Sequence, residues 1–135
     1  MTVFRSLDVV CALLERDGHI LAARRSDSMA QPGKWEFPGG KIEPDEAADK
    51  ALVREIREEL CCEIMVGDSV APIDHVYPEF RIRLMPFWCS LESGEPRPVE
   101  HAEIRWCTKQ VLEDLEWAAA DALVVETVLS RQWKS

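Results

Sequence analysis

The sequence lacks any long uninterrupted apolar stretch. No segment reaches the roughly 18 apolar residues that a membrane-spanning helix needs. Residues 1–8 include Arg5 and lack the apolar core of a cleavable signal peptide. Internal repeats, linkers and low-complexity tracts are also missing. We therefore expect a single soluble domain over residues 1–135, located in the cytoplasm and not bound to a membrane.

Cysteine patterns typical of disulfides or metal sites are missing as well. The five cysteines are an odd number and show no CxxC or Cys/His spacing, which predicts reduced, mostly buried thiols. Basic residues are few, because 16 lysines and arginines stand against 25 aspartates and glutamates, for a formal net charge of -9. This charge disfavours a nucleic-acid polymer as partner. A small anionic substrate can still bind if metal ions bridge it to carboxylates.

Several segments have the composition of β-strands. Apolar and β-branched residues bounded by turn residues predict strands at 7–14, 20–23, 35–37, 63–73, 80–91 and 104–107. The first two read as a β-hairpin, and a Pro38-Gly39-Gly40 turn closes the third. Pro86 predicts that the strand over 80–91 is an edge strand or is bulged at that point.

Three helical segments are predicted between and after these strands. Residues 45–60 contain no proline or glycine and repeat apolar residues with helical spacing, with Asp45 as candidate N-cap. A short helical turn is expected at 108–112 and a terminal helix at 118–133. The last is predicted to pack through Leu123, Val124, Thr127 and Val128. This order of elements predicts an α/β (α+β) fold in which a mixed β-sheet is sandwiched between helices.

Three carboxylates share one side of the long helix. Glu55, Glu58 and Glu59 lie within roughly 100° of arc at about 100° per residue. Their mutual repulsion calls for compensation, and divalent cations that prefer oxygen ligands can supply it. The alternative is a solvated helix face of paired glutamates and arginines. Upstream, the Gly39-Gly40 pair lets the backbone approach a phosphate or offer carbonyl oxygens to a metal.

The spacing of these groups carries a family resemblance. Gly40 is followed by five residues, Glu46, seven residues, and then Arg54-Glu55-Ile56-Arg57-Glu58-Glu59. This resembles the Nudix box of the Nudix hydrolases, G-x5-E-x7-R-E-U-x-E-E-x-G-U with U aliphatic, at every charged position. Cys61 stands where the family has glycine, and Cys62 fills the final aliphatic slot. A glycine there is usually left-handed, which would cost a cysteine about 1 kcal/mol.

The resemblance extends over nearly the whole chain. Residues 34–44 look like the entry to the box in the MutT-like branch, and residues 115–125 look like its base-side helix. That branch contains nucleotide-pool-sanitising enzymes such as 8-oxo-dGTP diphosphatase and CTP pyrophosphohydrolase. The resemblance implies Mg2+-dependent hydrolysis of a nucleoside triphosphate to the monophosphate and pyrophosphate, with Mn2+ able to substitute. A monomer or a homodimer is expected.

By the same resemblance, the metal ligands are the Gly39 carbonyl and the carboxylates of Glu55, Glu58, Glu59 and Glu100. One metal would polarise the phosphoryl group while another lowers the pKa of the attacking water. Either Glu55 or Glu100 would be the general base. The alternative for Glu100 is an ordinary acid in a loop.

Further residues complete the predicted site. Glu46 and Arg54 are expected to form an orienting ion pair, with an ordinary exposed pair as the alternative. Arg25 would contact the phosphates or sugar, unless it is a solvated strand end. The predicted substrate-binding residues are Arg25, Glu36, Phe37, Pro38, Gly39 and Asp121.

Two of these residues would contact the base. Phe37 would stack on it, an interaction worth about 1–3 kcal/mol, whereas core packing is the alternative role. Asp121 would read the base edge or else cap its helix. An ionised carboxylate only accepts hydrogen bonds, which slightly favours CTP or a broad specificity without excluding 8-oxo-dGTP. The histidines His19, His75 and His101 show no metal-ligand spacing and are assigned to turns, loops or the surface.

Other functions remain open at this point. A non-catalytic nucleotide-binding module of the same fold usually loses part of the Arg-Glu-x-x-Glu-Glu set, which this chain retains. A Nudix hydrolase of ADP-ribose or dinucleoside polyphosphates is another alternative. An acidic structural protein would leave the spacing from Gly39-Gly40 to Glu46 unexplained.

Overall fold

A mixed β-sheet lies at the centre of the fold. The computed structural model describes residues 5–130. The strands run in the order β3-β2-β1-β7-β5, with β4 paired to β1, β6 to β7 and β8 to β2. Among these pairs β1 and β7 are parallel and the others antiparallel. The strands are β1 (Arg5–Arg16), β2 (His19–Arg24), β3 (Trp35–Glu36), β4 (Gly39–Lys41), β5 (Glu63–Ser69), β6 (Ile73–Val76), β7 (Phe80–Ser93) and β8 (Glu103–Cys107).

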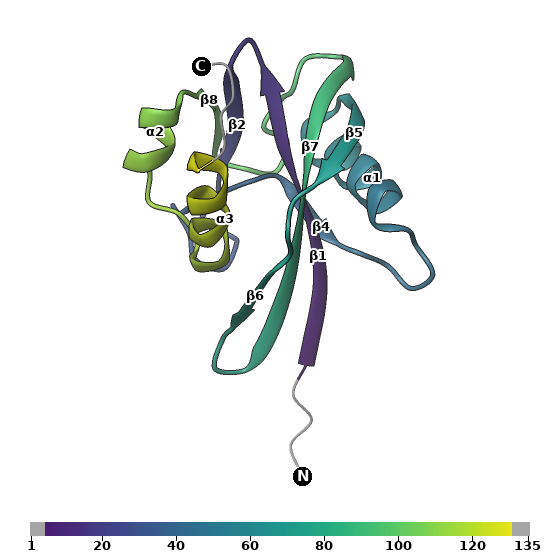
Figure 1. Ribbon diagram of the computed structural model, residues 1–135, viewed down its shortest axis with the longest axis vertical. Coiled ribbons are helices and arrows are strands. Elements are labelled where there is room, and N and C mark those ends of the chain that lie inside the picture. The colour runs from purple at the N-terminus through teal and green to yellow at the C-terminus, as the bar shows by residue number, and fades with distance from the viewer. Residues whose placement is uncertain (1–4, 131–135) are drawn as a thin grey trace.

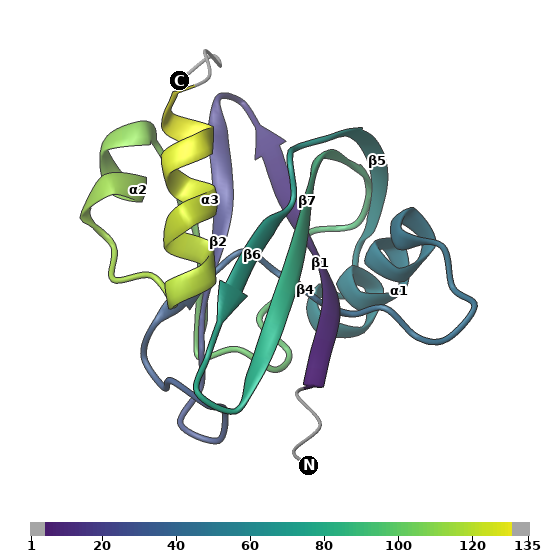
Figure 2. The same ribbon diagram turned by 60° about the horizontal axis from the view of Figure 1, so that its bottom comes forward.

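Helices cover the sheet on two sides. α1 (Ala48–Leu60) packs against β1, β4 and β5, whereas α3 (Ala119–Leu129) contacts β6 and β7 and lies beside α2 (Lys109–Asp114). Figures 1 and 2 show α1 on one side of the strands and the α2–α3 pair on the other. The predicted mixed sheet between helices is therefore confirmed. Within residues 5–130 no helix has the length and apolarity required to cross a membrane.

Strand β1 explains why the molecule has two hydrophobic clusters. Side chains alternate along a strand, so Val10, Ala12 and Leu14 pack on the α1 side while Cys11 and Leu13 pack on the α3 side. All five are buried because both faces of this part of the sheet are covered.

The hairpin β1–β2 is present as predicted, but the later strands differ from expectation. The segment predicted as one strand over 63–73 is divided into β5 and β6, which pair with different parts of β7. The edge position predicted from Pro86 is wrong, since β7 lies between β1 and both of these strands. Pro86 is tolerated because β6 pairs with β7 only up to Leu84, and β5 takes over at Phe87. The partner strand thus changes where the proline lacks an N–H.

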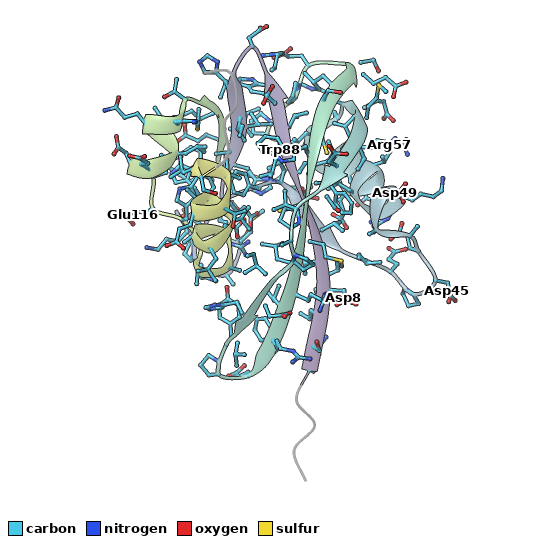
Figure 3. All side chains as sticks on the ribbon, viewed as in Figure 1. Asp8, Asp45, Asp49, Arg57, Trp88 and Glu116 are labelled. Atoms are coloured by element: carbon cyan, nitrogen blue, oxygen red, sulfur yellow. The ribbon has the colours of Figure 1, made fainter. Side chains whose placement is uncertain are left out.

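The start of α1 also differs from expectation. Asp45 does not cap the helix, which begins at Ala48 with Ala47 as N-cap. Glu46 N–H instead bonds to the Glu43 carbonyl, a tight turn in which Asp45 has a φ of 63°. Figure 3 shows Asp45 at the outer end of the loop before α1. Pro44 and this turn delay the helix by three residues.

The end of α1 and the last helix complete the comparison with the sequence. Cys61 closes α1 in the left-handed conformation that a glycine usually adopts at this position, with φ 54° and ψ 38°. In α3, Val124 and Val128 are buried as expected, whereas Leu123 is exposed. The predicted extension of that helix to Trp133 lies outside the described residues. Four of the five reduced cysteines are buried, and Cys61 is exposed.

Candidate active site

Two glycines let β4 fit between β1 and the carboxylates of α1. The expected turn at Gly39-Gly40 is wrong, because both residues belong to β4 and pair with Cys11 and Val10 of β1. A Cβ added to Gly39 would lie 2.0 Å from the Val10 carbonyl oxygen. A Cβ added to Gly40 would lie 2.4 Å from the Glu55 carboxylate. The glycines are therefore required by close approach on both sides of this short strand.

Glu59 points inward from α1 to this strand. Only 8% of the residue is exposed, and its Oε2 accepts a hydrogen bond of 3.1 Å from the Gly39 N–H. Burial first, and then the charges of Glu36, Glu55 and Glu100, raise the pKa of Glu59 to about 9. The Gly39 N–H opposes this shift by stabilising the charged form.

Glu55 and Glu100 complete a group of interacting carboxylates. Burial raises the pKa of Glu55, Arg54 opposes the shift, and the charges of Glu58 and Glu100 add to it. Glu100 lies on an exposed loop that is bonded to the end of α1, because the Val99 N–H donates to the Glu59 carbonyl at 3.2 Å. The loop acid predicted from sequence is thus brought beside the helix carboxylates.

Arg54 connects these carboxylates to the loop before the helix. Its guanidinium bonds to both oxygens of Glu46 at 2.8 and 2.9 Å, to Glu55 at 2.9 Å and to the Lys41 carbonyl at 3.1 Å. These hydrogen bonds lower the pKa of Glu46 to about 2. The predicted Glu46–Arg54 ion pair is therefore present, although Glu46 stands before α1 and not on it. Through Arg54 the pair also restrains the Glu55 side chain.

The oxygen donors suit a hard divalent cation, but they are not gathered into a finished set of ligands. Over residues 5–130 no three His, Cys, Asp or Glu side chains form a group that could hold a metal ion. Glu59 is bonded to the Gly39 N–H and Glu55 to Arg54, while the side chain of Glu58 is 55% exposed. A cation here would relieve the repulsion that raises the pKa values of Glu55 and Glu59. The donor set fits a cation that keeps several waters.

A pocket of about 370 Å³ opens beside Glu59 and reaches α3. Its walls come from β1, β4, the loop after β2, the β6–β7 hairpin and the start of α3. The predicted residues that line it are Arg25, Glu36, Phe37, Gly39, Glu59 and Asp121. Sequence analysis missed Tyr77 and Phe80, which line it from the β6–β7 hairpin and stack at 5.0 Å.

Asp121 and Phe37 meet at the α3 end of this pocket. The Phe37 N–H donates to Asp121 Oδ1 at 3.0 Å. Asp121 does not cap its helix, since the N-cap is Ala118. The start of α3, which carries Asp121, is held beside β3 because the Ala118 N–H donates a hydrogen bond of 2.8 Å to the Trp35 carbonyl. Burial first and Glu36 second raise the pKa of Asp121 to about 8, against hydrogen bonding from the Phe37 N–H and the charge of Arg25.

Phe37 and Pro38 also have structural roles. Phe37 is buried and stacks on Trp117 at 4.7 Å, so it packs in the core while one part lines the pocket. Pro38 is fully buried, and its carbonyl accepts a hydrogen bond of 2.8 Å from the Ala12 N–H. It is not among the residues that line the pocket, so the structure does not bring this predicted substrate contact to the site.

Arg25 and Glu36 form an ion pair at the pocket wall. Arg25 Nη1 lies 2.5 Å from Glu36 Oε1, and Arg25 Nε also donates to the Ala30 carbonyl. The solvated strand end considered for Arg25 is therefore wrong. The second oxygen of Glu36 lies 2.7 Å from His101 Nε2. His101 lies in the loop before β8, one of the places expected for it, but it is buried, and no sequence pattern indicated this contact.

Comparisons with known proteins agree with this geometry. A family model described as "NUDIX domain" matches residues 9–127. The chain belongs to the Nudix hydrolase family. A "CTP pyrophosphohydrolase" of Escherichia coli (strain K12) is 38% identical over 126 residues, covering 93% of each chain. A "Putative 8-oxo-dGTP diphosphatase 2" of Mycobacterium tuberculosis (strain H37Rv) is 35% identical over 116 residues, or 84% of this chain and 81% of the relative.

A solved structure of the same family shares the fold of this Nudix hydrolase. It is MutT from methicillin-resistant Staphylococcus aureus 252, which is 40% identical, with a TM-score of 0.77 over 95% of this chain and 98% of that one. The fold and family expected from the Nudix box are confirmed. Divalent metal dependence is general in this family.

Proposed function

We propose that this Nudix hydrolase is a Mg2+-dependent nucleoside triphosphate pyrophosphohydrolase that acts on CTP/dCTP-type or oxidised purine (8-oxo-dGTP) nucleotides. The observation that carries this proposal is the single pocket that joins Glu59 and Gly39 at one end to Phe37 and Asp121 at the other. One end has Glu59, one of the carboxylates proposed to hold the metal of a triphosphate, and the other has an aromatic ring and a buried carboxyl group. The names of the E. coli and M. tuberculosis relatives support the same substrate classes.

In this proposal the triphosphate end belongs to the Nudix-box helix. Glu55, Glu58, Glu59, Glu100 and the Gly39 carbonyl would hold Mg2+, for which Mn2+ can substitute. The bound metal would supply charge neutralisation at the phosphates and a more acidic attacking water. Either Glu55 or Glu100 removes the proton of that water as it attacks an internal phosphorus and pyrophosphate leaves.

The charge state of Asp121 supports a choice of base. With a pKa of about 8 the carboxyl group is largely protonated at neutral pH. A protonated carboxyl group donates one hydrogen bond and accepts others. Cytosine offers an amine donor beside a ring-nitrogen acceptor, and 8-oxoguanine offers an N7–H donor beside its O6 acceptor. Unmodified guanine offers only acceptors on its N7 edge, so a contact between Asp121 and that purine edge would make dGTP the poorer substrate.

The first experiment measures pyrophosphate release with Mg2+ from CTP, dCTP, 5-methyl-dCTP, dGTP and 8-oxo-dGTP. We expect release of monophosphate and pyrophosphate, with the cytosine and 8-oxoguanine nucleotides preferred over dGTP. Excess EDTA should abolish release. No release from any of the five, or release of orthophosphate with a nucleoside diphosphate, would contradict the proposal. ADP-ribose and dinucleoside polyphosphates would then be tested.

The same assay tests the carboxylates of the helix. Glu58→Gln should abolish turnover while keeping the fold, because it removes a metal-binding charge without changing volume at a half-exposed position. Glu63→Gln is a matched control, since Glu63 is paired with Arg57 and is not one of the proposed metal ligands. Full activity of Glu58→Gln at ordinary Mg2+ would refute its assignment.

We further propose that residues 1–135 act as one cytoplasmic domain, as a monomer or a homodimer. Sedimentation of the full chain measures its mass in solution. A larger assembly would contradict this part of the proposal.

A further inference from the structure

His101 is buried behind the pocket in contact with a residue of the pocket wall. Its side chain has an exposed fraction of 0%, and its Nε2 lies 2.7 Å from Glu36 Oε2. A carboxylate only accepts hydrogen bonds, so Nε2 is the donor. His101 itself does not line the pocket. Any effect of the imidazole on a bound nucleotide therefore passes through Glu36.

Glu36 is held from both sides by this arrangement. Its Oε1 lies 2.5 Å from Arg25 Nη1, and its Oε2 is bonded to His101. Glu36 and Arg25 both line the pocket. The charge of Glu36 acts at both ends of the pocket, since it raises the pKa values of Glu59 and Asp121. The orientation of this one carboxylate thus influences the whole surface that would receive a nucleotide.

The loop that carries His101 has other supports. The Val99 N–H bonds to the Glu59 carbonyl at 3.2 Å, and the Ala102 N–H bonds to the Arg24 carbonyl at 2.9 Å. These backbone bonds flank Glu100 and His101 and do not involve the imidazole. Loss of the imidazole should therefore leave Glu100 near α1 while releasing Glu36.

We propose that His101 is a positioning residue for nucleotide binding, which holds Glu36, and through it Arg25, in the orientation that the pocket requires. This inference rests on the proposed function. Glu36 without His101 would keep its pair with Arg25 but lose its second anchor, so both side chains could leave the pocket wall together. Substrate binding should suffer more than the chemical step.

The test compares His101→Gln with His101→Asn. Both place the same amide at this position, but only glutamine extends far enough to put an N–H near the place of Nε2. With the best substrate of the panel, we expect His101→Asn to raise KM about ten-fold, with kcat within about two-fold of wild type, because a hydrogen bond to a charged group is lost. His101→Gln should restore KM to within about three-fold. His19→Gln is the control, since His19 lies in the β1–β2 hairpin outside the pocket.

A second comparison asks whether His101 acts through Glu36. If it does, His101→Asn in a Glu36→Ala background should have the KM of Glu36→Ala alone. Equal KM values for the Gln and Asn variants, a fall in kcat without a change in KM, or a further rise in KM in the Glu36→Ala background would each overturn the inference.

A binding measurement separates this inference from the proposed function. Calorimetry with the α,β-methylene analogue of CTP and Mg2+ should show weaker binding by His101→Asn than by His101→Gln. Active wild-type enzyme with equal binding by both variants would overturn the role of His101 alone. Wild-type protein that neither turns over the panel nor binds the analogue would overturn both.

Discussion

The buried carboxyl group of Asp121 should make stability depend on pH, and replacement by asparagine should remove that dependence. Asparagine has the same shape as a protonated aspartic acid and keeps an oxygen to accept the 3.0 Å hydrogen bond from the Phe37 N–H. It cannot ionise in this pH range. The comparison of Asp121→Asn with wild type therefore isolates the ionisation of one side chain.

The sign follows from the two pKa values. The pKa of Asp121 is raised from its ordinary 3.8 to about 8 in the folded protein, chiefly by burial. Between these values the folded state binds the proton more tightly than the unfolded state does. The protonated group contributes its stability below about pH 4, and this contribution is lost as the pH rises toward 8. Each pH unit in that window corresponds to about 1.4 kcal/mol.

The assay is urea unfolding of both proteins at pH 5, 6 and 7. The free energy of unfolding of Asp121→Asn relative to wild type should increase by about 3 kcal/mol from pH 5 to pH 7. Other titrating groups such as Glu59 are present in both proteins, so their contributions largely cancel. An offset that adds equally at every pH to this increase would reflect packing. If the difference in the free energy of unfolding is the same at pH 5 and pH 7, the raised pKa is refuted and, with it, the base selection derived from a protonated Asp121.

Three further substitutions test the backbone of β4 and the end of α1. Gly40→Ala should keep the fold but lower kcat at least about ten-fold, because the new Cβ displaces the flexible end of Glu55. Gly39→Ala should lower the free energy of unfolding by about 3 kcal/mol or more, since its Cβ meets the rigid Val10 carbonyl. Equal melting temperatures for Gly39→Ala and Gly40→Ala would contradict this difference between a rigid and a flexible neighbour. Cys61→Gly should raise the free energy of unfolding by up to about 1 kcal/mol, because glycine adopts a φ of 54° without strain. A loss of stability in urea would show that the cysteine side chain stabilises the helix end.

Much of the catalytic helix could be predicted from sequence because its information is local. Helical spacing alone predicted that Glu55, Glu58 and Glu59 share one side of α1. The separation of eight residues between Glu46 and Arg54 predicted their ion pair, although Glu46 lies before the helix. The left-handed conformation usual for a glycine at this helix end is adopted here by Cys61. The N-cap prediction for Asp45 was wrong because another local structure uses this residue. Asp45 belongs to the turn that the Glu46 N–H closes by donating to the Glu43 carbonyl.

The pocket depended instead on residues that are distant in sequence. Arg25, Glu36, His101 and Asp121 come from four separate segments, and only the folded sheet and α3 bring them together. Neither the burial of Asp121 nor its protonation could be derived from a single chain segment, because desolvation is set by what packs around the carboxyl group.

The sequence by itself determined the family, the helix α1 and the side of α1 that carries the proposed catalytic carboxylates, because periodicity and motif spacing act over a few residues. The tertiary structure decided that Gly39 and Gly40 form a strand, that Pro86 lies inside the sheet, and that His101 contacts Glu36. These features depend on close approach between distant segments, as for His101 and Glu36, which are 65 residues apart. Such contacts are set by how the sheet and helices pack, and a local sequence pattern does not predict them.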